Sequence, residues 1–163
     1  LYDVKPDVMG CGKAAGGGIL PVSFVASRDD VIGTLTPGSE GSTFGGYPLA
    51  SVVGVYAIKT LIDEKLSENA LKRGAQLMEG LNSIKQDFAD KIKIVRGKGL
   101  LTAFEMFDSP HLDGHHVSVE LMNNGIYAKE THHTTIRLAP ALTINANQID
   151  HLLDGIRTVI KKL

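Results

Sequence analysis

The hydrophobic pattern divides the chain into two parts. In the first part, residues 19–26 form a nearly continuous apolar run, which is typical of a strand buried on both faces and predicts a sheet covered by helices. Residues 4–9 are a shorter strand candidate, and residues 29–32 a short helix. From Pro48 onward, apolar residues recur at helical spacing around much of the circumference, which predicts a helix between layers. Its end at residues 63–65 is the expected domain boundary.

The second part alternates helices with strands. Ser67 is the expected N-cap of an amphipathic helix that extends to Phe88. Asn145 and Gln148 form a predicted capping box ahead of a final amphipathic helix. Between these helices we expect further elements, which are strands at residues 92–95, 100–107, 126–129 and 135–139 and a short helix ending near Gly125. The predicted fold class is therefore α/β, with an α+β unit at residues 65–163 attached to the end of an α/β layer at residues 1–64.

Composition and charge exclude several classes of function. With 163 residues, of which 43% are apolar and 21% charged, the chain is typical of soluble globular proteins. The net charge of −1 and the lack of a dense Lys/Arg tract argue against nucleic acid or an anionic membrane as a partner. No apolar stretch is long enough for a membrane span or a signal peptide. A single cysteine, Cys11, cannot form an internal disulfide, which fits a reducing compartment such as the cytoplasm.

The glycines and the first residue carry further information. The 18 glycines cluster at residues 10–18, 38–46 and 97–99, which indicates functional turns rather than disorder. The chain opens without a methionine, so we expect a fragment of a longer polypeptide.

Lys13 is the first candidate for chemistry. It lies between Gly12 and Ala14, with three further glycines directly after Ala15. Small neighbours let a ligand or backbone approach the amine closely, and a deprotonated lysine can attack a carbonyl. The alternative is an ordinary loop lysine beside a glycine turn.

Ser42 and Thr43 are the second candidate, because these adjacent hydroxyls lie among glycines just ahead of a helix N-terminus. Hydroxyls together with free backbone amides suit a phosphate group, although Ser/Thr/Gly loops are common.

Arg137 is the third candidate, because it interrupts an otherwise apolar strand. A buried guanidinium needs a partner, for which a bidentate carboxylate is suited. That carboxylate belongs either to a substrate or to a structural salt bridge.

The histidine pairs and the cysteine are weaker candidates. His115 with His116, and His132 with His133, are adjacent on loops, where neighbouring histidines rarely converge on one ion, so we expect no metal site. Cys11 is expected to be a small buried hydrophobe, with an oxidation-sensitive thiol as the alternative.

Read together, the motifs resemble a known family. Residues 5–17 (KPD, GKA and GG) resemble the cofactor-lysine motif of class III (fold-type I) aminotransferases, and residues 37–50 (PGSEGSTFGGYPLA) resemble the phosphate-contacting loop and following helix of that family. The segments PVS (21–23), RGKGL (96–100), KETH (129–132) and IRLAP (136–140) look most like its ornithine-specific branch. The resemblance covers essentially the whole chain. It implies the C-terminal part of a large cofactor-binding domain at residues 1–64, including an interdomain helix, followed by a small α+β domain at residues 65–163.

The resemblance also implies roles for the candidate residues. Lys13 would hold pyridoxal 5′-phosphate as a Schiff base and then act as base and acid. Thr43, with Ser42, would contact the cofactor phosphate of the neighbouring subunit, which implies a homodimer or higher oligomer. Arg137 would bind a substrate carboxylate. The implied reaction transfers the δ-amino group of L-ornithine to 2-oxoglutarate, giving glutamate 5-semialdehyde and glutamate.

Departures from the family pattern limit these expectations. Tyr47 stands where the family usually has asparagine. The aspartate that pairs with the pyridine nitrogen, the stacking aromatic and the glycine-rich phosphate turn should all precede residue 1, so we expect no transamination without the missing N-terminal half. That half could carry a transit peptide to the mitochondrial matrix. The alternatives are an acetylornithine or other ω-amino-acid aminotransferase, or a non-catalytic module that binds a phosphate ligand.

Overall fold

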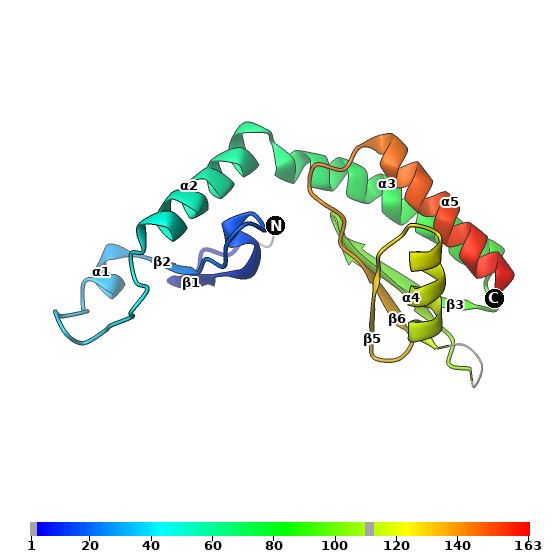
Figure 1. Ribbon diagram of the computed structural model, residues 1–163, viewed down its shortest axis with the longest axis horizontal. Coiled ribbons are helices and arrows are strands. Elements are labelled where there is room, and N and C mark those ends of the chain that lie inside the picture. Colours follow the sequence, from blue (N-terminus) through cyan, green and yellow to red (C-terminus); the bar gives the residue numbers. More distant parts are fainter. Residues whose placement is uncertain (1–2, 110–112) are drawn as a thin grey trace. The chain divides into compact units, whose positions relative to one another are not determined.

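The chain forms two compact units, Leu1–Glu64 and Lys65–Leu163, each of which is described by itself. The structure is a computed structural model that describes residues 3–109 and 113–163 (Figure 1). None of the helices within these ranges has the length and apolar character that crossing a membrane requires.

The first unit combines a two-stranded ribbon with helices. Its elements are β1 (Val8–Cys11), the 3₁₀ helix η1 (Lys13–Gly16), β2 (Phe24–Ser27), α1 (Asp29–Ile32) and α2 (Pro48–Asp63). The two strands pair antiparallel, with Val8 opposite Ser27 and Cys11 opposite Phe24. The first strand therefore begins later and ends later than the predicted one at residues 4–9, whereas α1 agrees with its prediction.

The prediction of a strand buried on both faces at residues 19–26 is wrong for this chain. Only its end is strand, and its side chains are open: Ile19 is 82% exposed and Val25 59%. Gly16 and Gly54 are the only buried residues among those described in the first unit. An apolar run indicates that a strand can be buried, but it does not show whether residues of this chain or of another chain cover it. The first unit thus has apolar elements without a core of its own.

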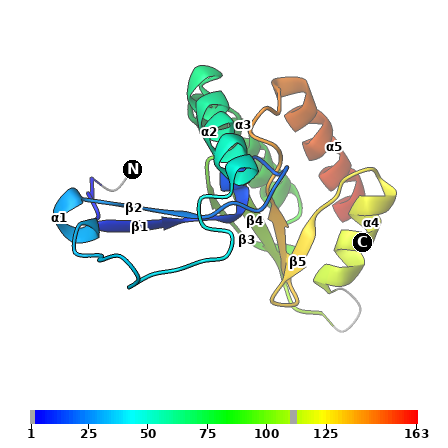
Figure 2. The same cartoon turned by 60° about the vertical axis from the view of Figure 1, so that its left-hand side comes forward.

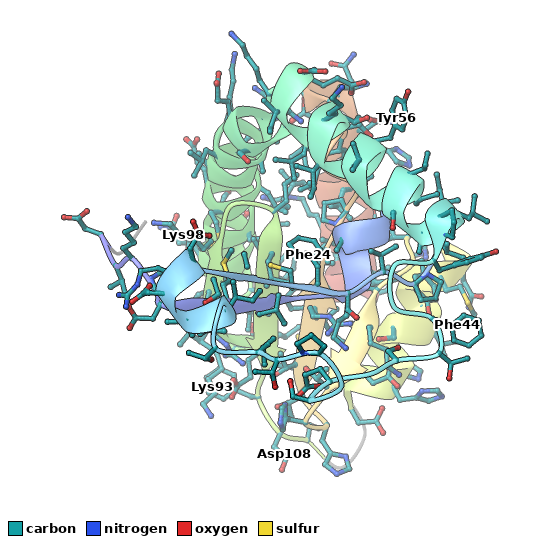
Figure 3. The ribbon with its side chains drawn as sticks, turned by 90° about the vertical axis from the view of Figure 1, so that its left-hand side faces the viewer. Phe24, Phe44, Tyr56, Lys93, Lys98 and Asp108 are labelled. Atoms are coloured by element: carbon teal, nitrogen blue, oxygen red, sulfur yellow. The ribbon has the colours of Figure 1, made fainter. Side chains whose placement is uncertain are left out.

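Helix α2 agrees with its predicted start, because Pro48 occupies its first turn. The position of this helix between two layers is not seen within the described residues. Its apolar side chains are largely exposed, including Val52, Val55 and Tyr56. Tyr56, at 66% exposure, projects from α2 in Figure 3.

The second unit packs helices against one antiparallel sheet. Its elements are α3 (Leu66–Asp87), β3 (Ile92–Lys98), β4 (Leu101–Met106), α4 (Gly114–Asn123), β5 (Lys129–Thr131), β6 (Thr135–Leu138) and α5 (Ala146–Lys162). The strand order is β3-β4-β6-β5, and neighbouring strands are antiparallel (Figure 2). Burial alternates along β4, where Thr102, Phe104 and Met106 are buried and the residues between them are more exposed. The helices therefore cover one face of the sheet and leave the other open.

A continuous core fills the space between the helices and the covered face of the sheet. The predicted apolar stripe of α3 is confirmed, since Leu77, Leu81 and Ile84 are buried and Phe88 packs against them. Helix α5 contributes four buried residues, which are Ile149, Ile156, Val159 and Ile160. This unit therefore has the core that the first unit lacks.

The two helix starts predicted in this unit have different outcomes. Ser67 is not the N-cap of α3, because the helix already begins at Leu66 and Lys65 takes the cap position with a left-handed φ of 52°. The capping box of α5 is confirmed. The Asn145 side chain accepts from the amide of Gln148 at 3.0 Å, and the Asn145 amide donates to the Gln148 side chain at 2.9 Å.

Candidate active site

Lys13 stands at the first position of η1, directly after β1 and Gly12. Its φ is 53°, a left-handed conformation that costs a residue with a side chain about 1–3 kcal/mol. The side chain is exposed, and no described residue forms a hydrogen bond or ion pair with it. The strained backbone conformation thus belongs to a lysine whose amine is accessible to a ligand.

Close packing fixes the backbone around Lys13. The amide of Gly17 donates to the carbonyl of Ala14 at 2.9 Å, which closes the turn. A Cβ at Gly16 would lie 3.1 Å from Val22 Cγ2, and one at Gly17 would lie 3.3 Å from the Cβ of Ala57 on α2. Gly17 also has a φ of 62°, which favours glycine. These glycines let α2 and the segment after η1 approach the lysine turn closely.

A concavity of about 1090 Å³ opens beside this turn, between the ribbon, the loop at residues 37–46 and α2. Its lining is mostly apolar but includes Cys11 and Ser42. Cys11 is half-buried, so the predicted burial is only partial. Lys13 and Thr43 are not among the lining residues. The concavity therefore does not unite the lysine with both predicted phosphate-binding hydroxyls.

The hydroxyl loop has the predicted form. Ser42 and Thr43 are exposed, and within the described ranges neither hydroxyl has a hydrogen-bond partner. The loop ends in a turn in which the amide of Gly45 donates to the carbonyl of Ser42 at 3.1 Å. Helix α2 follows at once, and its cap residue Tyr47 offers no side-chain bond. The first amides of α2 and the two hydroxyls are thus left for an anion.

Arg137 is exposed, which corrects the expectation of a buried guanidinium. Side chains alternate along β6, so Thr135 and Arg137 point to one face while Ile136 and Leu138 enter the core on the other. The alternative of a structural salt bridge is not seen among the described residues, because none of them forms an ion pair with Arg137. The planar guanidinium group of Arg137 is therefore accessible to a ligand on the open face of the sheet.

The neighbours of Arg137 favour an anion at this position. Directly opposite on β4 is Ala103, which offers no charge, and directly opposite on β5 is Lys129. Like charges in cross-strand pairs destabilise a sheet. Lys129 donates to Glu130 at 3.3 Å, whereas Arg137 has no such partner within residues 3–109 and 113–163. A bound carboxylate would relieve the repulsion between the two cations.

An ion cluster on the same face was missed in the sequence. Glu105 of β4 accepts from Arg96 at 2.8 Å and from Lys93 at 3.1 Å. The Arg96 guanidinium beside Glu105, with help from Lys93, holds the pKa of that carboxyl below its ordinary value. The sequence signal was the presence of Lys93, Arg96 and Glu105 in or beside two consecutive predicted strands, which a hairpin brings together although their positions are not directly opposite.

The candidate residues are divided between the two units of the chain. Lys13 belongs to the first unit and Arg137 to the second. His115 lies 3.7 Å from Glu130, but the described residues contain no group of three or more side chains that could hold a metal ion.

The exposed amine and hydroxyls fit part of a pyridoxal phosphate site. Lys13 offers a free amine, and Ser42 and Thr43 offer unpaired hydroxyls. The ring nitrogen would also need a carboxylate. In the first unit, Asp7 and Asp30 form ion pairs with Arg28, and no carboxylate of this unit forms an ion pair with Lys13 within the described residues. Lys13, Ser42 and Thr43 are thus the residues of this unit that could hold the aldehyde and the phosphate of such a cofactor, and no described carboxylate is assigned to its ring nitrogen.

Comparisons with known proteins point to one family of enzymes. The sequence model of the aminotransferase class-III family matches residues 1–160. The ornithine aminotransferase of Arabidopsis thaliana mitochondria is 42% identical over 156 residues, covering 94% of this chain and 32% of that protein. The ornithine aminotransferase of an Exiguobacterium species is 41% identical over 160 residues, covering 97% of this chain and 38% of that protein.

Solved structures match the whole length of the chain. An acetylornithine aminotransferase from Elizabethkingia anophelis has a TM-score of 0.93 at 40% identity, covering 99% of this chain and 40% of that one. An ornithine aminotransferase from Plasmodium yoelii has a TM-score of 0.91 at 40% identity, covering 99% and 42%. The chain thus spans about 32–42% of the length of these relatives.

Proposed function

The chain belongs to the class III aminotransferase family, and we propose that it forms the lysine-bearing C-terminal part of an ornithine-type aminotransferase. Enzymes of this family depend on pyridoxal phosphate. The observation that carries the proposal is Lys13, which has a strained φ of 53° and an amine without a partner in the described part of the chain, inside the region that the family model matches. Sequence identity of 41–42% to ornithine aminotransferases supports the choice of branch.

The proposed reaction transfers the δ-amino group of L-ornithine to 2-oxoglutarate. The products are glutamate 5-semialdehyde and glutamate. When bound, pyridoxal phosphate supplies the sink for the electrons released at the substrate carbon. Lys13 Nζ binds the cofactor and, when the substrate amine has replaced it, accepts the proton from the substrate carbon and later returns a proton. One amine thus serves for binding and for proton transfer.

Arg137 would orient a substrate through its carboxylate. The planar guanidinium can bind both carboxylate oxygens at once, which fixes the direction of the substrate as well as its charge. Lys129, directly across from it, adds positive charge on the same face. The lack of any protein carboxylate on Arg137 within the described ranges supports this role.

Ser42 and Thr43 would bind the cofactor phosphate of a neighbouring subunit, so the enzyme would be a homodimer or a higher oligomer. Their unpaired hydroxyls, placed ahead of the first turn of α2, support the phosphate as ligand.

The remainder of the enzyme would cover the exposed apolar elements of the first unit. The ribbon presents Val8 and Val25 to solvent, and α2 presents Val52 and Val55. Exposed apolar area of this kind marks an interaction surface in a soluble protein. We expect the missing N-terminal half to pack here and to bring the carboxylate for the ring nitrogen.

An acetylornithine aminotransferase is the second candidate, favoured by the TM-score of 0.93 to such an enzyme. An activity panel on the complete enzyme separates the two candidates, with ornithine, acetylornithine and other ω-amino acids as donors and 2-oxoglutarate as acceptor. The proposal predicts the highest kcat/KM with ornithine, and a preference for acetylornithine would contradict it. Absence of turnover with every donor would favour a non-catalytic phosphate-binding module. The 163-residue chain alone is expected to be inactive.

A further inference from the structure

Val22 packs between the lysine turn and helix α2. A Cβ at Gly16, the last residue of η1, would lie 3.1 Å from Val22 Cγ2, and a Cβ at Gly54 on α2 would lie 3.3 Å from Val22 Cγ1. Because neither glycine has a side chain, the two methyl groups of Val22 fill the space at both positions. A single side chain therefore packs against η1 with one methyl group and against α2 with the other.

The contact around Val22 is shielded from solvent. Gly16 and Gly54 are buried, and Val22 between them is half-buried. Ala57 lies three residues after Gly54 and thus on the same side of α2. It continues the contact toward Gly17, where a Cβ would lie 3.3 Å from the Cβ of Ala57. Packing this close leaves little room for η1 to move against α2.

The 3₁₀ helix connects this contact to Lys13. Residues three apart in such a helix lie one turn apart on the same side, so Gly16 follows Lys13 directly along the helix. The turn is closed by the amide of Gly17, which donates to the carbonyl of Ala14 at 2.9 Å. Lys13 has a φ of 53°, a conformation that persists only where the surrounding structure enforces it. The packing of Val22 against Gly16 supplies such a constraint.

We propose that Val22 is a positioning residue for Lys13, because it holds the turn that carries the amine against α2. This inference rests on the proposed function, in which the amine of Lys13 binds the cofactor and transfers the proton. The size of the Val22 side chain sets how closely η1 approaches α2, and thereby where the amine lies. A displacement of about 1 Å at a reacting group can cost on the order of a hundredfold in rate.

The first test uses the complete enzyme without cofactor and needs no turnover. Pyridoxal phosphate reacts with the Lys13 amine with release of water, and the change in absorbance gives the rate of this step. Pyridoxine phosphate has an alcohol in place of the aldehyde, so its Kd reports the remainder of the site alone. Val22→Ala is expected to slow the reaction with pyridoxal phosphate roughly tenfold and to leave the Kd of pyridoxine phosphate within about twofold of the parent value. A loss at least as large for pyridoxine phosphate, or an unchanged reaction with pyridoxal phosphate, overturns the inference.

Gly54→Ala provides the second test, because its methyl group would stand close to Val22 Cγ1. On its own this variant crowds Val22 and should slow the reaction with pyridoxal phosphate about twofold. Combined with Val22→Ala, it refills part of the gap and should restore the rate to within about threefold of the parent value. Losses that simply add in the double variant contradict a packing contact between the two residues.

Two further variants separate positioning from general stability. Val22→Ile adds one methylene and crowds the lysine turn instead of leaving a gap, so it should also slow the reaction, and it serves as the test if Val22→Ala does not fold. Val95→Ala is the matched control, because it removes the same two methyl groups from a half-buried valine of the second unit. It should lower the melting temperature and leave the rate unchanged. A parent-like rate in Val22→Ile, or a rate in Val95→Ala as slow as in Val22→Ala, overturns the inference.

The proposed function and this inference fail in different ways. If borohydride fixes the cofactor to a residue other than Lys13 in the complete enzyme, the role of Lys13 is wrong. If the adduct lies on Lys13 but the Val22 variants react with pyridoxal phosphate at the parent rate, only the positioning role of Val22 is wrong.

Discussion

Gly74 on α3 lies against the backbone of Gly99, in the turn between β3 and β4. A Cβ at Gly74 would stand 2.6 Å from the Cα of Gly99, a distance that real Cβ atoms do not tolerate. Gly99 itself has a φ of 55° and lies close to Ala70. The helix and the hairpin turn thus meet backbone to backbone, which brings the apolar stripe of α3 onto the sheet.

Gly74→Ala should therefore destabilise the second unit. Backbone cannot rotate away as a side chain can, so α3 or the hairpin must shift, and we expect a loss of about 3 kcal/mol in the free energy of unfolding. Chemical denaturation of the chain measures it. Gly80→Ala is the comparison, because its Cβ would meet the flexible side chain of Leu153. A loss at position 74 no larger than at position 80 would contradict this account of the contact.

Asn145→Ala should weaken the start of α5. The substitution removes the side-chain acceptor for the amide of Gln148 and with it half of the capping box. Loss of such a cap costs about 1 kcal/mol. Denaturant midpoints of the variant and the parent chain test the value, and Asn82→Ala, in the exposed middle of α3, serves as control. An unchanged midpoint would show that the cap bond contributes nothing.

The pH dependence of stability should reveal Glu105. Because Arg96 and Lys93 lower its folded-state pKa, the unfolded chain binds more protons at this site in mild acid. The stabilisation from Glu105 is therefore fully present above the ordinary Glu pKa of about 4.5 and is lost as the pH falls through the lower folded-state value.

Thermal unfolding of Glu105→Gln measures this contribution. The variant should be less stable than the parent chain at pH 6, and the difference should disappear toward pH 3. Glu79→Gln, which removes an exposed carboxylate without an ion pair among the described residues, should show no such convergence. A difference that stays constant with pH would mean that the charge of Glu105 is not what stabilises the fold.

The outcome for each prediction from sequence depends on whether the signal was local. Pro48 at the first turn of α2 and the capping box at Asn145 were predicted correctly, because neighbouring residues determine them. Ser67 was not the cap, because Lys65 adopts a left-handed conformation that residue type alone does not predict. The apolar run at residues 19–26 predicted a buried strand, but burial depends on partner surfaces that a local pattern does not contain.

The candidate site shows the same limit. The lysine between small residues and the hydroxyl loop could be found from composition, and the structure confirms their local form. The exposure of Arg137 depends on which face of β6 packs against the core. A shift of the strand register by one residue would reverse the two faces, and the sequence alone does not determine that register. The cluster around Glu105 was missed because Arg96 is nine residues away in sequence and becomes a neighbour only through the hairpin.

Arg137 variants should separate charge from geometry in the complete enzyme. Arg137→Gln is expected to lower kcat/KM by about two orders of magnitude, since an uncompensated substrate carboxylate costs several kcal/mol. Arg137→Lys keeps the charge but not the planar guanidinium, so its kcat/KM should lie between that of Arg137→Gln and that of the parent enzyme. Steady-state kinetics with ornithine and 2-oxoglutarate measure both, and Arg157→Gln provides the control. Equal activities of the Gln and Lys variants would argue against bidentate binding.

The central claim is that Lys13 carries the cofactor. Its most direct test is borohydride reduction of the complete enzyme after loading with pyridoxal phosphate, followed by peptide mapping with mass spectrometry. We predict a single stoichiometric pyridoxyl adduct on the peptide that contains Lys13, and none in Lys13→Arg. An adduct on another lysine such as Lys5, or none on Lys13 in the fully loaded enzyme, would contradict the account.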